Sequence, residues 1–321
     1  MLICPDIPMK QELIQHKSIA IIGPTACGKT RRAVEIAREF NGEILSADSR
    51  QVYRRMDIGT GKDLNEYAEI PYHLIDICEP GTKYNLYQYL RDFRAAYDGV
   101  ARRGRLPVIC GGSGMYVENA LAGVYLPEVP ENQSLRNSLK DKTLEELTSI
   151  LKKFKTLHNT TDVDTSARAI RAIEIQEYYR DHPDAAAMAD IRTAQPLDCI
   201  IIGLDISREQ RRKRISCRLE DRLAAGMIEE INELLDSGLS ADDLIYYGLE
   251  YKFVTLYVTG QLSRQEMQRQ LEIAIHQFAK RQMTWFRGME RRGFRILWVP
   301  YDISSHELLQ IVEENISSVK P

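Results

Sequence analysis

The sequence predicts an α/β fold in which a parallel sheet is flanked by helices and a small helical subdomain is inserted. Apolar, β-rich runs alternate with segments of helical periodicity along most of the chain. These runs are continuously apolar, which is typical of parallel strands covered on both faces. The length of 321 residues, with 44% hydrophobic and 28% charged residues, allows a sizeable core and excludes a disordered chain.

Six strands are expected. In chain order they lie at 18–23, 42–49, 72–77, 106–112, 198–206 and 294–299. A helix is expected over about 28–40, and another after residue 85, where apolar residues fall on one helical face. That face comprises Leu86, Leu90, Phe93, Tyr97 and Val100.

Two long helices are expected between the last two strands. Each opens with a capping-box pattern, in which two side chains satisfy free backbone amides of the first turn. The paired residues are Ser207 with Gln210 and Ser263 with Glu266. The second helix carries an apolar face formed by Met267, Leu271, Ala274 and Phe278.

Residues 127–196 break the alternation of strands and helices. Prolines lie at both ends of this stretch, and two helix-like segments, 143–154 and 166–180, lie within it. We therefore expect a core formed by residues 1–126 and 197–321, with 127–196 as a helical insertion. The alternative is that these helices are crossovers of a single domain.

The segment GPTACGKT at 23–30 is the strongest functional signal. It matches the pattern GxxxxGK[ST] and lies between an apolar strand and a helix, which predicts a P-loop NTPase-like sheet. The glycines let the backbone wrap around phosphate oxygens, Lys29 neutralises charge, and the Thr30 hydroxyl is placed to coordinate Mg²⁺. The motif predicts a polyphosphate ligand but does not distinguish ATP, GTP or another diphosphate. The residues expected to bind it are Gly23, Pro24, Thr25, Ala26, Cys27, Gly28, Lys29 and Thr30.

Asp48 lies at the carboxyl end of the second expected strand, where open α/β sheets bind their ligands. A carboxylate there can be a metal ligand, a general base or a helix cap, and the nearby phosphate loop favours catalysis. After the fourth strand, GGSGMY (111–116) places glycines and Ser113 where a nucleotide hydrolase commonly has an acid. This weakens the interpretation as an ATPase. Asp76 remains a possible second acid, and a structural role for it is equally open.

Several segments together resemble the bacterial tRNA isopentenyltransferase family, the tRNA dimethylallyltransferases. The resemblance runs in order over about residues 18–290. Beyond the phosphate loop and GGSGMY, the segments that carry it are SADSRQVYRRMDIGTGK (46–62), PYHLIDICEP (71–80), RAIRAIEI (168–175), RLEDRLAAGMIEEI (218–231) and AKRQMTWFRG (279–288).

The resemblance implies transfer of a dimethylallyl group from dimethylallyl diphosphate to N6 of the adenosine adjacent to the anticodon, position 37 of the tRNA. It implies the tRNA anticodon stem-loop and dimethylallyl diphosphate as partners and Mg²⁺ as cofactor. It further implies that Asp48 is the base and that Arg218 clamps the diphosphate together with Lys29 and Thr30. The residues implied to contact tRNA are Asp48, Ser49, Arg50, Gln51, Ser113, Arg136, Ala167, Arg168, Ala169, Ile170 and Arg171.

Some positions depart from the family's pattern. Cys27 stands where serine is commoner, and Thr165 where an aspartate often precedes the Arg168 run. Arg50 and Ser113 replace commoner neighbours, and GLEYK (248–252) departs from a GYKE-like sequence. None of these changes affects Lys29, Thr30, Asp48 or Arg218.

Two basic clusters suit an RNA backbone, although a solvated helix face is the better explanation for any single arginine. The first contains Arg208, Arg211, Arg212, Lys213, Arg214, Arg218 and Arg222. The second contains Lys280, Arg281, Arg287, Arg291, Arg292 and Arg295.

Three other functions compete with this interpretation. An adenylate-type isopentenyltransferase acting on free AMP would share the loop and the base, but needs neither a helical insertion nor a basic C-terminal region. A P-loop small-molecule kinase would be expected to carry the missing acid. A noncatalytic RNA-binding protein would not need Lys29, Thr30 and Asp48 intact.

Composition and targeting signals indicate the cellular compartment of the protein. The net charge is −3, and the six cysteines form no CxxC or Cys/His cluster, which favours buried thiols in a reducing compartment over a zinc site. The sequence shows neither a secretory signal nor an apolar run of membrane-spanning length. We therefore expect a cytoplasmic protein without membrane contact. Nothing in the sequence reports on oligomeric state, and a monomer is the expectation.

Overall fold

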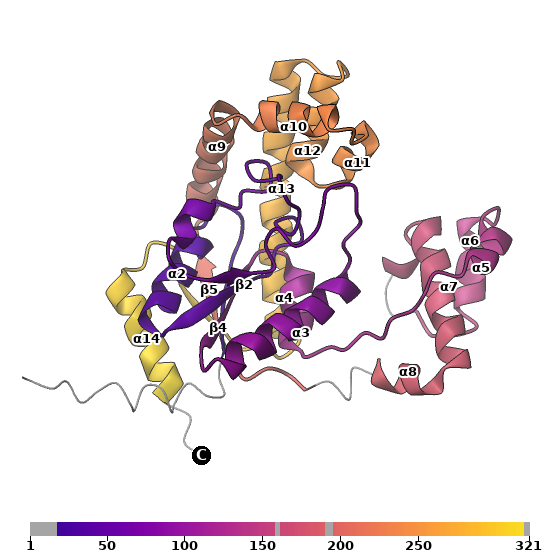
Figure 1. Ribbon diagram of the computed structural model, residues 1–321, viewed down its shortest axis with the longest axis horizontal. Coiled ribbons are helices and arrows are strands. Elements are labelled where there is room, and N and C mark those ends of the chain that lie inside the picture. Colours follow the sequence, from indigo (N-terminus) through magenta and orange to yellow (C-terminus); the bar gives the residue numbers. More distant parts are fainter. Residues whose placement is uncertain (1–17, 158–160, 190–194, 318–321) are drawn as a thin grey trace, which may run out of the picture. The chain divides into compact units, whose positions relative to one another are not determined.

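The computed structural model describes residues 18–157, 161–189 and 195–317. The described residues fall into two compact units, Val124–Gln195 and the rest of the chain, so the observed division lies within a few residues of the expected boundaries at 127 and 196 (Figure 1). Among the described helices, none combines the length and apolar character that a membrane crossing requires.

A six-stranded parallel sheet forms the centre of the larger unit, with strand order β3-β2-β4-β1-β5-β6. The strands are β1 (Ser18–Ile22), β2 (Gly42–Ser46), β3 (Tyr72–His73), β4 (Leu106–Gly111), β5 (Cys199–Asp205) and β6 (Ile296–Pro300). β1 lies between β4 and β5, with Ile19 opposite Val108 on one side and Ile200 on the other. The predicted parallel sheet is thereby confirmed.

Helices cover both faces of this sheet (Figure 1). α2 (Lys29–Glu39) and α14 (Ser305–Ser317) pack together on one face, while α3 (Leu86–Arg102) and α4 (Gly114–Leu121) lie against the strands on the other. Successive strand residues point to opposite faces, so Ile19 and Ile21 join the core shared with α2 and α14. Every residue of β1 is buried, because neither face of a sheet covered in this way meets water.

The third strand is much shorter than the predicted 72–77. It ends at His73 because Leu74 and Asp76 adopt positive φ values of 66° and 55°, which a pleated strand does not tolerate. The bend brings Asp76 to the fully buried Lys62, whose ammonium donates to its carboxylate. Lys62 also donates to the Tyr53 carbonyl at 2.6 Å. Asp76 is therefore a structural partner of a buried lysine.

The segment between β5 and β6 forms five helices, where two were expected. They are α9 (Arg208–Ala224), α10 (Met227–Asp236), α11 (Ala241–Tyr246), α12 (Leu249–Val258) and α13 (Arg264–Arg291). Gly226, at φ 101°, takes the left-handed conformation between two helices, so the helix that opens after Ser207 ends at Ala224 and α10 follows as a separate helix. Ser207 and Ser263 cap α9 and α13 by accepting the backbone N–H groups of Gln210 and Glu266, but the reciprocal bond from the Gln210 or Glu266 side chain that would complete a capping box is not formed.

The predicted apolar face of α13 is correct only in its first half. Met267 and Leu271 are buried, but Phe278 is 37% exposed. Buried residues that recur every four positions rotate gradually around a helix of 28 residues, and here they continue through Ile275, Ala279 and Met283. This rotation leaves Phe278 at the surface.

The smaller unit is helical. Its elements are α5 (Gln133–Leu139), α6 (Leu144–Leu151), the 3₁₀ turn η2 (Thr161–Val163), α7 (Ser166–Asp181) and α8 (Pro183–Met188), while a second 3₁₀ turn, η1 (Leu64–Tyr67), belongs to the larger unit. It has its own apolar core, in which Leu147, Leu151 and Ile173 are fully buried. None of its described residues forms a strand, as the sequence predicted.

A buried carboxylate holds this unit together. Glu174, on α7, is 2% exposed and accepts hydrogen bonds from the Asn132 backbone N–H at 2.6 Å and from the Arg136 guanidinium at 3.0 Å. Arg171 also donates to it, and reaches the Val129 carbonyl at 2.8 Å. Burial by itself would raise the pKa of Glu174, but the bonds from Arg136 and Arg171 outweigh burial and lower its pKa below 4.5.

We predict that Glu174→Gln lowers the free energy of unfolding of this unit by about 2 kcal/mol at neutral pH, because hydrogen bonds to a charged acceptor are lost. Since the folded pKa lies below the unfolded value, this contribution is present above the unfolded pKa and is lost as the pH falls through the folded pKa. Hydrogen exchange of residues 124–157, at pH 7 and in acid, measures it. Glu177→Gln on the same helix is the control, and equal protection in both variants at pH 7 would contradict the assignment.

Candidate functional site

The phosphate loop connects β1 to α2 at the carboxyl edge of the sheet. Ala26 and Gly28 take positive φ values of 62° and 87°, which turn the chain so that α2 begins at Lys29. The Cys27 thiol fills the space under the loop, and a Cβ on Gly23 would lie 2.8 Å from its sulfur. The Lys29 ammonium donates to the Pro24 carbonyl at 2.8 Å and lines the adjacent cavity. Backbone amides and a positive helix end thus face one space, as anion binding requires.

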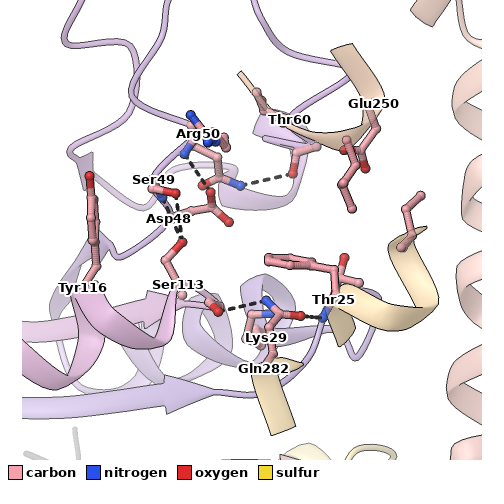
Figure 2. Close-up of a pocket in the computed structure, with 18 of the residues that line it drawn as sticks. Thr25, Lys29, Asp48, Ser49, Arg50, Thr60, Ser113, Tyr116, Glu250 and Gln282 are labelled. Atoms are coloured by element: carbon pink, nitrogen blue, oxygen red, sulfur yellow. Dashed lines mark hydrogen bonds between the residues drawn. The ribbon is translucent and has the colours of Figure 1, made fainter. Parts of the chain in front are cut away.

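A cavity of about 570 Å³ opens beside this loop (Figure 2). Its lining comes from the loops that follow β1, β2 and β4, from residues 247–250 at the start of α12, and from side chains of α9 and α13. All of these elements belong to the larger unit. The cavity joins Lys29 and Thr30 of the phosphate loop to Asp48, Ser113 and Arg218.

Asp48 projects from the end of β2 into this space (Figure 2). Its Oδ1 accepts the Arg50 backbone N–H at 2.9 Å, while Oδ2 has no protein partner among the described residues. The Ser49 N–H donates to Ser113 Oγ at 3.0 Å, which fixes the two loops to each other. Asp48 therefore combines a held carboxylate with one oxygen open to a ligand, the arrangement a proton acceptor needs.

Arg50 and Gln51, the two residues after Ser49, differ in whether other protein groups occupy their side chains. Gln51 lines the cavity, but its Oε1 accepts from Ser46 Oγ at 3.0 Å and its Nε2 donates to the Gly61 carbonyl at 3.1 Å. Its amide is therefore occupied within the protein. The Arg50 guanidinium instead lies over the Tyr246 ring, 5.3 Å from its centroid, at the edge of the cavity.

Two arginines of α9 face the cavity around Gly61. Arg218 pairs with Asp63 and donates to the Gly61 carbonyl at 3.4 Å. Arg222 forms a 3.3 Å ion pair with Glu250, and its Nε is buried without a partner among the described residues. Burial lowers the pKa of Arg222, with Arg218 adding to the effect, and burial raises the pKa of Glu250. With Lys29, these guanidiniums form a cationic wall suited to a polyphosphate.

Gln282 is a site residue that the sequence analysis did not single out. It lies in the buried stripe of α13, 6% exposed, where its Oε1 accepts the Thr25 N–H at 2.8 Å and its Nε2 donates to the Gly112 carbonyl at 2.8 Å (Figure 2). One amide thereby joins the phosphate loop to the loop that carries Ser113. A glutamine inside an otherwise apolar helix stripe was the available signal, because buried amides are placed where they find partners.

The remaining wall of the cavity is apolar and aromatic. Met115, Phe278 and Trp285 line it and are 46%, 37% and 41% exposed, so they form an accessible surface. Burial raises the pKa of Tyr116 to about 12, which keeps its phenol neutral. Such a wall suits a hydrocarbon chain or the face of a base.

The residues of the smaller unit that were expected to contact tRNA fall into two groups. Ala167 and Arg168 are exposed, with Arg168 paired to Asp164. Ala169 is fully buried, so its side chain is not available to an RNA, and Ile170 is half-buried against the same core. The Glu174 carboxylate occupies both Arg136 and Arg171, as described above, and gives these two arginines a structural role.

Comparison with known proteins identifies the family. The IPP transferase family model matches residues 51–289, and the isopentenyl transferase model matches 16–70. The chain is 56% identical to "tRNA dimethylallyltransferase 1" of Parabacteroides distasonis, covering 91% of this chain and 95% of the relative. It is 59% identical to "tRNA dimethylallyltransferase 2" of Phocaeicola vulgatus, covering 89% and 92%.

Solved structures of similar proteins resemble this structure. A full-length tRNA isopentenylpyrophosphate transferase from Bacillus halodurans is 29% identical, with a TM-score of 0.69, over 94% of this chain and 97% of that one. A eukaryotic dimethylallyltransferase acting on tRNA has a TM-score of 0.76 over 95% and 80% of the two chains; at 20% identity it supports the fold alone. The resemblance carried by the sequence motifs is thereby confirmed, and the chain belongs to the IPP transferase family of tRNA isopentenyltransferases.

Proposed function

We propose that this protein transfers a dimethylallyl group from dimethylallyl diphosphate to N6 of the adenosine adjacent to the anticodon of tRNA. The observation that carries the proposal is the meeting, in one cavity, of a phosphate loop, an open carboxylate and an apolar wall. The names of relatives that are 56% and 59% identical over most of the chain support it.

The cationic side of the cavity suits the leaving group. Breaking the allylic C–O bond leaves negative charge on the diphosphate, and groups already in place stabilise that charge most effectively. Lys29 and Arg218 line the cavity beside the loop amides, so they are our choice for this role. The apolar residues Phe278 and Trp285 would hold the hydrocarbon or the base away from water.

The open oxygen of Asp48 suits the other half of the reaction. As N6 attacks the allylic carbon, a C–N bond forms, the C–O bond breaks, and N6 must lose a proton. Asp48 Oδ2 would accept that proton, while the backbone bond from Arg50 holds the carboxylate in position. The adenine must leave the anticodon-loop stack to reach this site, a step common to enzymes that act on bases.

The residues at the loop also fit a Mg²⁺ ion. The described residues contain no group of three or more His, Cys, Asp or Glu side chains arranged to hold a metal ion. Mg²⁺ bound to phosphorylated substrates often takes most of its ligands from phosphate oxygens and water, so the Thr30 hydroxyl beside a diphosphate suffices as the protein ligand. When bound, the ion would neutralise charge on the leaving diphosphate.

Exposed basic groups support a tRNA partner. α9 and α13 bring the guanidiniums of Arg208, Arg211 and Arg287 together, and burial, together with Arg287 and Arg208, lowers the pKa of Arg211. Such a like-charge group is stabilised by phosphates of a nucleic acid.

We place the reaction in the cytoplasm, with the protein as a monomer.

One assay tests the proposed function against its alternatives. The purified protein is given labelled dimethylallyl diphosphate with either tRNA or AMP, and labelled ATP in a parallel reaction. We expect label to appear in tRNA, as N6-dimethylallyladenosine by mass spectrometry of its nucleosides. Transfer to AMP alone would instead identify an adenylate-type enzyme, and phosphate transfer from ATP a kinase.

We predict that Asp48→Asn slows single-turnover transfer by about 10²- to 10⁴-fold, because an amide keeps the shape but cannot accept the N6 proton. Binding of both substrates should change little. A rate restored by high Mg²⁺ would identify Asp48 as a metal ligand. A wild-type rate at low and high Mg²⁺ would contradict any catalytic role.

We predict that Arg168→Ala weakens tRNA binding and reduces the slope of log affinity against log salt by about 1, the effect of losing one phosphate contact. Arg168 is chosen over Arg171 because Arg171 is bound to Glu174 and its loss would disturb folding. Arg180→Ala, an exposed position on the same helix, is the control. Equal salt slopes for Arg168→Ala and wild type would remove Arg168 from the tRNA interface.

A further inference from the structure

The carboxylate of Glu230, on α10, is a hub for one of the loops that line the cavity. Its Oε2 accepts the backbone N–H groups of Asp57 and Ile58, each at 2.7 Å. Its Oε1 accepts the Gly59 N–H at 3.0 Å and the Tyr251 hydroxyl at 2.6 Å. Three consecutive amides and a phenol thus converge on one side chain. Only an ionised carboxylate offers two oxygens with room for four donors.

The ring of Tyr251 also packs against the loop that Glu230 holds. It is 1% exposed, and its ring lies so close to Gly59 that a Cβ there would come within 2.7 Å of ring carbons. The phenol next to the Glu230 carboxylate has its pKa raised well above 10, chiefly by burial, so it remains a donor. The backbone at 57–59 is therefore held from α10 by hydrogen bonds and from α12 by packing.

The same loop ends at Gly61, which touches the cationic wall. The Gly61 N–H donates to the Asp57 carbonyl at 2.9 Å, so its position follows from that of the anchored segment. Its carbonyl accepts Gln51 Nε2 at 3.1 Å and the Arg218 guanidinium at 3.4 Å. A side chain at Gly61 would overlap the Arg222 guanidinium. Gly61 therefore lies against both guanidiniums, and its carbonyl is one of the two groups that hold Arg218, the other being Asp63.

From these contacts we propose that Glu230 is a positioning residue of the transferase, which sets the Gly61 carbonyl and thereby aims Arg218 at the diphosphate. The proposal rests on the function proposed above, in which Arg218 binds the leaving group. Glu230 does not itself line the cavity, so it acts only through the loop. Glu230, Arg218 and Arg222 stand on the adjacent helices α9 and α10, so the loop is fixed to the same helix pair that carries the guanidiniums.

A double-mutant cycle tests this role. Glu230→Gln keeps the size of the side chain but offers one oxygen and an NH₂ donor, so at least two of the four donors lose their acceptor. We expect kcat/KM for dimethylallyl diphosphate to fall by about 10- to 100-fold, since displacement of a positioned group by about 1 Å costs on the order of 10²-fold. Affinity for tRNA should stay unchanged. In an Arg218→Ala background, the same Glu230→Gln change should cost less than about 3-fold, because the group it aims is gone.

The control is Glu229→Gln, an exposed carboxylate in the same first turn of α10, which should leave kcat/KM unchanged. If Glu230→Gln does not fold, Tyr251→Phe removes one donor of the four and enters the same cycle, with a smaller loss expected in the same parameter. Equal costs with and without Arg218 would overturn the positioning role. A silent Arg218→Ala would instead refute the diphosphate assignment on which it rests.

Discussion

The site depends on the parallel pairing of β2, β4 and β1. β4 lies between the other two strands and hydrogen-bonds to both, so their three carboxyl ends meet at one edge of the sheet. β1 leads into the phosphate loop, β2 into Asp48, and β4 into Ser113. At this edge the Ala47 N–H donates to the Cys110 carbonyl at 2.8 Å, and a side chain at Gly111 would overlap the Ala47 carbonyl. The phosphate loop and the Asp48 carboxylate are adjacent because the hydrogen bonds between these strands bring their carboxyl ends together.

Polar side chains then fix the loops that the hydrogen bonds between the strands do not reach. Lys62 holds the bend after β3, Gln282 ties the phosphate loop to the end of β4, and Glu230 holds the backbone at 57–59. Lys62 and Gln282 are buried, and a buried polar group without partners is costly, so their contacts are strongly specified. Gln282 and Glu230 position their loops from helices far away in the sequence, and Lys62 does so from a neighbouring loop, which gives the loops around the cavity a defined geometry without regular secondary structure.

The sequence predicted much of the fold because its signals were local. Apolar runs located all six strands, and capping patterns located the starts of α9 and α13. The errors occurred where single residues turn the backbone. The apolar run at 72–77 gave no sign that Leu74 would adopt a positive φ or that Asp76 would pair with Lys62. The sequence analysis also gave no end for the helix that opens after Ser207, although Gly226, a glycine at a helix end, is a signal that could have been used.

By itself, the sequence determined the phosphate loop, the position of Asp48 at a strand end, and the family, because each lies in a short continuous motif whose chemistry is set by its own residues. Only the tertiary structure decided which arginines remain available. Arg136 and Arg171 look like RNA ligands along the chain, yet Glu174 binds both, whereas Arg168 stays exposed. Only the tertiary structure also revealed Gln282 and Glu230, whose hydrogen-bond partners lie 257 and about 170 residues away. A side chain's partner depends on which segments the fold brings together, and no local pattern encodes that proximity.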